Sequence, residues 1–299
     1  MSAETCSHCW VKTSVAHPIP GSIIAPRETG AADCTVVNAR SALFDVYGDH
    51  LRPRGGAAPV AALLRMLAPL EVAAPAVRTA ISRMVRQGWL VPMRLDQGAG
   101  YRMTPQAERR LSAAASRIYR RGIAPWDGRW HVLVIDHTAE RSRRDRVRSG
   151  LGYLGYAPLR DNTWISPRAS SEVDGLLSAE GVRALRFWAA HDGDEASLAA
   201  SAWDLDGIGR TYASWLADAR VLVGDPARYV SDEQAFTIRS RLVHEWRKFL
   251  FRDPSLPHEL LPADWPGDVA AAYFDEEAER LAPGAGRFVD CCLRPMPSS

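Results

Sequence analysis

Hydrophobic positions recur at helical spacing from residue 38 to residue 87, and the pattern predicts three successive helices. The stretch "NARSALFDVYGDHL" places Leu43, Val46 and Tyr47 on one side, with Phe44 adding bulk, before "RPRGG" breaks the run. "APVAALLRMLAPL" predicts a second helix. The third, within "PAVRTAISRMVRQGWL", has a proline in its first turn and is expected to stop at Gly88.

The third predicted helix separates apolar from cationic positions. Its apolar positions predict a buried face formed by Val77, Ile81, Met84 and Val85. The opposite side carries Arg78, Thr79, Ser82, Arg83 and Arg86. A solvated surface helix of an enzyme can show the same pattern, so the flanking sequence has to distinguish the two interpretations.

The sequence after Gly88 favours nucleic-acid binding. "WLVPMRLDQGAGYRMT" predicts two strands joined by a turn at "DQGAG", and helices followed by such a hairpin are typical of a winged helix-turn-helix. The third helix is then the recognition helix, which fits a major groove, while arginines of the hairpin reach the backbone or minor groove. We expect DNA contacts from these residues: Arg54, Arg78, Thr79, Ser82, Arg83, Arg86, Arg94 and Arg102.

A further helix, "TPQAERRLSAAASRIYRRG" with Thr104 as N-cap, precedes a region of alternating strands and helices. "WHVLVI" is hydrophobic on both faces and predicts an interior strand. "APLRDNTWISP" predicts a second strand around Trp164 and Ile165, "SSEVDGLLSAEG" a helix capped by Ser170 or Ser171, and "VRALRFWAAH" a further strand. Together with the charged helix in "RSRRDRVRSGLGYLGY", these elements predict a small α+β sandwich of ferredoxin type.

From about residue 200 the segments are mainly helical, the last one predicted over "PGDVAAAYFDEEAERL", and Ser231 or Asp232 is expected to cap the middle one. The proline-dense "DPSLPHELLPADWPG" predicts a loop or a very short helix. We therefore predict a multidomain α+β protein: a flexible extension over 1–37, a winged helix-turn-helix over 38–122, a ferredoxin-like domain over 123–198 and a helical effector or dimerisation domain over 199–299.

Charge is distributed unevenly along the chain. The formal net charge is only +2, but residues 38–121 hold fourteen arginines and five acids, a balance of +9 that leaves −7 for the rest. This asymmetry indicates that one module meets a polyanion, although a genome rich in G and C also favours arginine over lysine. Five irregularly spaced cysteines and the lack of a signal-peptide core predict a cytoplasmic protein without a disulfide framework.

Three longer stretches resemble the phenylacetic-acid degradation repressor (PaaX-type) family of bacterial transcription regulators: "RGGAAPVAALLRMLAPLEVAAPAVRTAISRMVRQGWL", "WDGRWHVLVIDH…RSGLGYLGYAPLRDNTWISP" and "RLVHEWRKFLFRDPSLPHELLPADWPG". The resemblance covers most of residues 38–290. It implies the three domains above and a homodimeric repressor that binds a palindromic operator. It also implies release by an aryl-acetyl-coenzyme A effector, phenylacetyl-CoA in the namesake case.

An acyl-CoA needs cations for its phosphates and an apolar slot for its acyl group. The helix ending "IRSRLVHEWRKFLFRD" offers both, so candidate effector contacts are Arg241, His244, Trp246, Arg247 and Lys248, although an amphipathic core helix with a solvated basic edge gives the same pattern. Arg247 and Arg252 also suit the helix dipole without a ligand.

Other chemistry is weakly indicated. The central region resembles the small ferredoxin-like nuclease of CRISPR adaptation systems. This resemblance raises the alternative of a metal-dependent nuclease that uses Asp136 beside His137. The favoured interpretation is that Asp136 caps the next helix. "CSHC" offers Cys6, His8 and Cys9, fewer ligands than a zinc site needs, within the expected flexible leader. No serine-hydrolase elbow or nucleotide-binding glycine loop is present, and Cys291–Cys292 is expected in a terminal tail. We therefore expect no catalytic residue, resident metal or cofactor.

Overall fold

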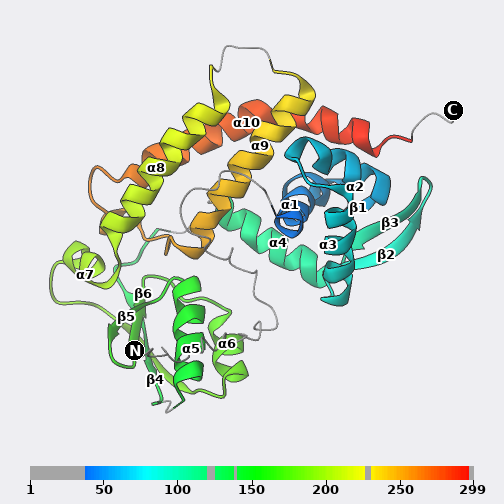
Figure 1. Cartoon of the computed structure of the whole chain (residues 1–299). Helices are drawn as coiled ribbons and strands as arrows, with labels where there is room; N and C mark the ends of the chain where they lie inside the picture. The colour runs from blue at the N-terminus through cyan, green and yellow to red at the C-terminus, as the bar shows by residue number, and fades with distance from the viewer. Residues whose placement is uncertain (1–37, 120–124, 138–139, 226–229, 296–299) are drawn as a thin grey trace, which may run out of the picture. The chain divides into compact units, whose positions relative to one another are not determined.

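The computed structural model describes residues 38–119, 125–137, 140–225 and 230–295. "CSHC" and the predicted leader lie outside these residues. The first part of the described chain contains helices and a three-stranded sheet (Figure 1): α1 (Ala39–Asp45), the π-helical turn η1 (Val46–Leu51), the 3₁₀ turn η2 (Arg52–Arg54), β1 (Ala57–Pro59), α2 (Val60–Leu67), the 3₁₀ turn η3 (Ala68–Leu70), α3 (Ala74–Arg86), β2 (Leu90–Leu95), β3 (Gly98–Met103) and α4 (Pro105–Ile118).

The predicted hairpin is present, but its turn is shorter than expected. β2 and β3 pair antiparallel with Leu95 opposite Gly98, so only Asp96 and Gln97 form the turn and the glycines of "GAG" belong to β3. β1 adds to the other edge of β3. Gly100 is required there, because a Cβ would lie 2.7 Å from the Ala58 carbonyl oxygen.

The central part contains β4 (Trp130–Ile135), α5 (Arg141–Tyr153), β5 (Ala157–Arg160), β6 (Thr163–Ser166), α6 (Val173–Ala179), β7 (Ala184–Ala189) and α7 (Glu195–Ala202). Its strands form one antiparallel sheet in the order β5-β6-β4-β7. The interior position predicted for "WHVLVI" is confirmed. The strand predicted around Trp164 and Ile165 is present as β6, but it does not span "APLRDNTWISP": the chain reverses between Arg160 and Thr163 and forms the β5–β6 hairpin.

Helices α5 and α6 cover one face of this sheet (Figure 1), where Leu133, Leu151 and Leu177 share a hydrophobic cluster. Helix α6 starts later than predicted: its N-cap is Glu172, and Ser170 only accepts a hydrogen bond from the Glu172 amide through its hydroxyl. On the other face, Trp130 and Ile165 join the core of the C-terminal part.

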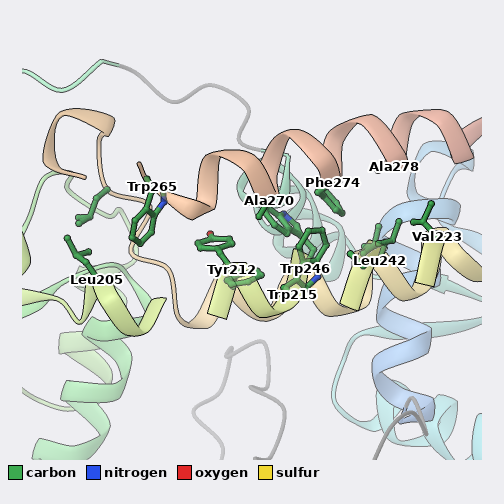
Figure 2. Close-up of a cluster of buried hydrophobic side chains, with 14 of the residues drawn as sticks. Leu205, Tyr212, Trp215, Val223, Leu242, Trp246, Trp265, Ala270, Phe274 and Ala278 are labelled. Carbon is green, nitrogen blue, oxygen red and sulfur yellow. The ribbon is translucent and has the colours of Figure 1, made fainter. Parts of the chain in front are cut away.

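The C-terminal part contains α8 (Leu205–Val223), α9 (Asp232–Trp246), the 3₁₀ turns η4 (Arg247–Phe251) and η5 (His258–Leu260), and α10 (Pro266–Leu293). Aromatic side chains fill the space between α8, α9 and α10 (Figure 2); Trp246 stacks on Phe274 with ring centroids 4.7 Å apart. Ser231 and Gln234 form a capping box at the start of α9, which confirms the predicted cap.

Helix α10 is longer than predicted. It continues through Pro283 to Leu293, so Cys291 and Cys292 lie in a helix and not in a tail. Packing on α9 explains this continuation: Ala285 and Val289 are buried, and a Cβ at Gly284 would lie 2.9 Å from the Ala235 Cβ. Tertiary contacts therefore outweigh the local helix breakers. Within the described ranges, no helix combines the length and apolar character that crossing a membrane requires.

Candidate nucleic-acid interface

Helix α3 presents the predicted basic edge to solvent. Val77, Ile81 and Met84 are buried, as predicted, together with Ala80, while Val85 is only partly buried. All five polar or cationic side chains expected on the opposite side are exposed: Arg78, Thr79, Ser82, Arg83 and Arg86. The chain leaves the helix at Gly88, whose φ of +72° favours glycine.

Packing fixes the rotation of α3 about its axis. Its apolar residues contact α1 and α2, and Phe44 of α1 lies edge-on to Trp89 with ring centroids 4.6 Å apart. Because Phe44 and Trp89 are both buried, a rotation of α3 would expose apolar surface. The helix therefore holds its three arginines outward before any ligand binds.

The hydroxyl groups on α3 retain acceptor capacity. Thr79 Oγ1 donates to the Pro75 carbonyl oxygen at 2.9 Å, and Ser82 Oγ donates to the Arg78 carbonyl oxygen at 3.1 Å. Each hydroxyl proton is thus used within the helix. Both side chains are then available to accept hydrogen bonds, for example from base amino groups.

Arg40 extends the basic edge of α3 and was missed by the sequence analysis. Its guanidinium lies 5.4 Å from the Phe44 ring centroid, and its buried Nε has no hydrogen-bond partner among the described residues. Burial lowers the pKa of the Arg40 guanidinium, and the charge of Arg83 lowers it further. An anion such as a DNA phosphate would stabilise these two neighbouring cations.

The two hairpin arginines lie on opposite faces of their sheet. Arg94 pairs with Ala99 across the ladder, whereas Arg102 pairs with Val91. Directly opposed residues share a face and successive residues alternate, so Arg94 and Arg102 point in opposite directions although both are exposed. One hairpin face therefore carries Arg94 and the other carries Arg102, which the sequence alone did not distinguish.

Arg54 is held by α10. Its Nε lies 2.7 Å from Asp290 Oδ1, and its Nη1 and Nη2 donate to the His50 and Gly286 carbonyl oxygens at 2.9 and 3.3 Å. These contacts give Arg54 a structural role that the sequence did not suggest.

Two acids of the basic N-terminal part are buried against α9. Asp45 Oδ2 accepts from His244 Nδ1 at 2.7 Å, and Asp45 Oδ1 lies 2.8 Å from Arg247 Nε. Asp49 accepts from Arg239 through two guanidinium nitrogens, each at 2.9 Å, and from the Tyr119 hydroxyl at 2.6 Å. We call these contacts of Asp45 and Asp49 with α9 and Tyr119 the acid clamp.

The acid clamp affects both stability and surface charge. Burial would raise the pKa of the Asp49 carboxyl, but neighbouring cations and the hydrogen bonds from Tyr119 and Arg239 outweigh burial, so this pKa lies below its ordinary value. Because the side chains of Asp45 and Asp49 are only 6% and 8% exposed, the only exposed acids among the described residues of 38–119 are Glu71, Asp96 and Glu108. The exposed surface of this part is thus strongly basic. Two acids on the apolar side of a predicted helix were the signal that sequence reasoning overlooked.

Comparisons with known proteins identify the family of this chain. Family models match residues 38–107 as a PaaX-like protein, residues 123–200 as a PaaX protein central Cas2-like domain, and residues 203–291 as a PaaX-like protein C-terminal domain. The transcriptional repressor PaaX of Escherichia coli (strain K12) is 31% identical over 275 residues, which cover 87% of this chain and 85% of the repressor. The chain belongs to the PaaX family.

A solved structure supports the same relationship. The uncharacterized protein Rv0674 from Mycobacterium tuberculosis is 28% identical to this PaaX-family chain, with a TM-score of 0.55. The match covers 85% of this chain and 98% of the solved one.

The structure separates the residues predicted to bind an effector. His244 and Arg247 belong to the acid clamp. Trp246 is buried in the aromatic core, and its Nε1 donates to the Ile118 carbonyl oxygen at 3.1 Å. Arg241 Nη2 lies 3.6 Å from Glu71 Oε2, and Lys248 pairs with Glu245. In this PaaX-family protein, α9 and η4 thus bind acids of the N-terminal part and do not present these five side chains to one pocket.

The nuclease alternative has no support. Asp136 Oδ2 pairs with Arg183 Nε at 3.2 Å. Among the residues that the structure describes, no three His, Cys, Asp or Glu side chains come together as a possible metal site. Membership of the PaaX family also favours a regulator over an enzyme.

Proposed function

We propose that this protein is a DNA-binding transcriptional repressor of a phenylacetate-type catabolic operon. In this proposal residues 38–122 form a winged helix-turn-helix with α3 as its recognition helix. The observation that carries the proposal is the exposed edge of α3, where Arg78, Arg83 and Arg86 project from a helix whose rotation is fixed by packing. The repressor title of the Escherichia coli relative supports the biological role.

Each group on this edge has a defined task in the proposed complex. An α-helix fits the major groove, and an arginine there can donate two hydrogen bonds to the O6 and N7 atoms of a guanine. Arg40, beside Arg83, is suited to a phosphate because an anion would offset the repulsion between the two guanidinium groups. Since Arg94 and Arg102 lie on opposite hairpin faces, we assign a DNA contact to only one of them in a given complex.

We further infer that an aryl-acetyl-CoA, with phenylacetyl-CoA as the first candidate, releases a homodimer of this protein from a palindromic operator. The central region over 123–198 is ferredoxin-like in this proposal, and the region over 199–299 receives the effector. The acid clamp supports a route between the sites, because α9 contacts both the C-terminal core and the helices that orient α3. Binding that shifts α9 would disturb Asp45 and Asp49 directly.

Fluorescence anisotropy tests the proposal. Wild-type protein is titrated against DNA from its own upstream region, with and without phenylacetyl-CoA, beside Arg83→Ala, Arg86→Ala and the double variant. If each arginine reads a base, each single substitution should weaken binding by about 1–3 kcal/mol. Arg210→Ala removes the same charge from an exposed position of α8 and should leave the affinity for DNA unchanged.

The outcomes separate the parts of the proposal. Specific binding that disappears with the double variant supports α3 as the recognition helix, whereas wild-type affinity of the double variant rejects it. Loss of binding on addition of the thioester supports the effector; unchanged binding rejects phenylacetyl-CoA and leaves the repressor assignment in place.

A further inference from the structure

Helix α5 of the central region carries a concentration of positive charge that the proposed recognition helix does not explain. The helix contains five arginines and one acid, Asp145, over thirteen residues. Two arginines are neutralised on the helix flanks: Arg143 pairs with Glu140 at 3.4 Å, and Arg146 with Glu180 at 2.9 Å. The arginines at positions 141, 144 and 148 are exposed.

These three arginines share one side of α5. Positions separated by three and by four residues are neighbours on a helix surface, so Arg141, Arg144 and Arg148 form a continuous stripe. Val147 and Leu151 are buried on the sheet side, and Gly150 permits the close approach of Leu176 from α6. These contacts fix the rotation of α5, and Figure 1 shows the helix beside α6 on one face of the sheet. We call these three residues the α5 arginine stripe.

Two members of the stripe, Arg141 and Arg148, have no side-chain partner within the described chain. The guanidinium groups of both residues lack an ion pair or hydrogen bond to a described residue, in contrast to those of Arg143 and Arg146. The first turn of α5 contains no acid, so Arg141 and Arg144 stand near the end of the helix where the dipole disfavours positive charge. A helix that only covered a sheet would be more stable with acids at these positions. A polyanionic partner would offset this repulsion.

We propose that the α5 arginine stripe is a second contact surface for the phosphate backbone of duplex DNA. The inference rests on the proposed DNA-binding function and extends the footprint beyond α3 and the hairpin. Duplex DNA is favoured because its phosphates repeat along the backbone as the arginines do along the helix, and because the chain already carries an exposed basic helix edge. These contacts add affinity and salt dependence but no base specificity.

The salt dependence of operator binding tests this inference. For full-length wild type and Arg141→Gln/Arg148→Gln, anisotropy gives the dependence of log K on log salt concentration for duplex DNA from the upstream region. Each lost phosphate contact lowers the slope by about 0.9, so the double variant should lose about 1.8. Arg141→Lys/Arg148→Lys keeps the charge and should retain most of the wild-type slope.

Matched variants identify the cause of any change. Arg143→Gln/Arg146→Gln removes the same charge from paired positions of the same helix and should leave the slope near that of wild type. The Tm of Arg141→Gln/Arg148→Gln should not fall below that of wild type, because the substitutions remove cations from the helix surface. If this variant binds with the wild-type slope and affinity, the inference is overturned while the role of α3 stands. If wild type itself binds no DNA, the proposed function fails first.

Discussion

Replacing Asp49 by asparagine should strongly destabilise the fold, because the substitution leaves a buried guanidinium without its counter-ion. The Arg239 and Asp49 side chains are only 12% and 8% exposed, and two guanidinium nitrogens contact the carboxylate. Removal of one partner from a buried ion pair costs about 3–5 kcal/mol. Arg239 would still donate to the Tyr119 hydroxyl and to the Ala278 carbonyl oxygen, so we expect the free energy of unfolding to fall by about 3 kcal/mol.

Urea unfolding followed by circular dichroism measures this loss. With a urea dependence of about 3 kcal/mol per molar, the midpoint should fall by about 1 M. Asp290→Asn is the matched control: it removes an acid from the more exposed Arg54 pair, and such pairs contribute only about 0–1 kcal/mol.

The effect of Asp49→Asn should also depend on pH. Because the pKa of Asp49 is lowered in the folded protein, its stabilising contribution is complete above the unfolded pKa of about 3.9 and is lost as pH falls through the folded pKa. The difference between wild type and variant should therefore be full at pH 7 and shrink in acid below about pH 4. A variant within about 1 kcal/mol of wild type at pH 7, or a difference that persists in acid, would refute the assignment of Asp49 as a buried, charged ion-pair partner.

Three other substitutions test local features by the same urea assay. Ser231→Ala removes the capping box of α9 and should cost about 1 kcal/mol, whereas Ser231→Asp should retain most of the wild-type stability. Equal stability of wild type and both variants would exclude a role for the cap. Gly88→Ala should cost about 1–2 kcal/mol from its positive φ alone, since no atom lies within 4 Å of the added Cβ; an unchanged midpoint would contradict that backbone conformation. Trp246→Ala should cost about 3–5 kcal/mol by emptying the aromatic core, and a loss below about 1 kcal/mol would mean that the core does not depend on this ring.

Local periodicity and capping were sufficient to predict several elements. The apolar spacing of "AVRTAISRMV" identified both the buried and exposed faces of α3, because a regular helix converts sequence spacing directly into direction. Ser231 and Thr104 were identified as caps since a cap bonds a backbone amide only a few residues away. The interior position of β4 followed from its two apolar faces.

Features that depend on distant residues were not predictable from spacing. The sequence placed His244 and Arg247 on a basic helix edge, but their partner Asp45 lies about two hundred positions earlier in the chain. Arg54 likewise meets Asp290 only through the packing of α10. The partners of an ionic side chain are set by which elements pack together, and this information is absent from a local window of sequence.

The sequence by itself determined the basic character of the N-terminal part, the faces of α3 and the family resemblance, because charge count and short-range periodicity are properties of the chain. Only the tertiary structure decided which acids are buried, which cations remain exposed and where helices end. Helix α10 continues past Pro283 because burial of Ala285 and Val289 outweighs the local preference to stop. Packing of α1 and η1 against α9 encloses the side chains of Asp45 and Asp49, while the arginines of α3 stay exposed as the candidate DNA-binding edge.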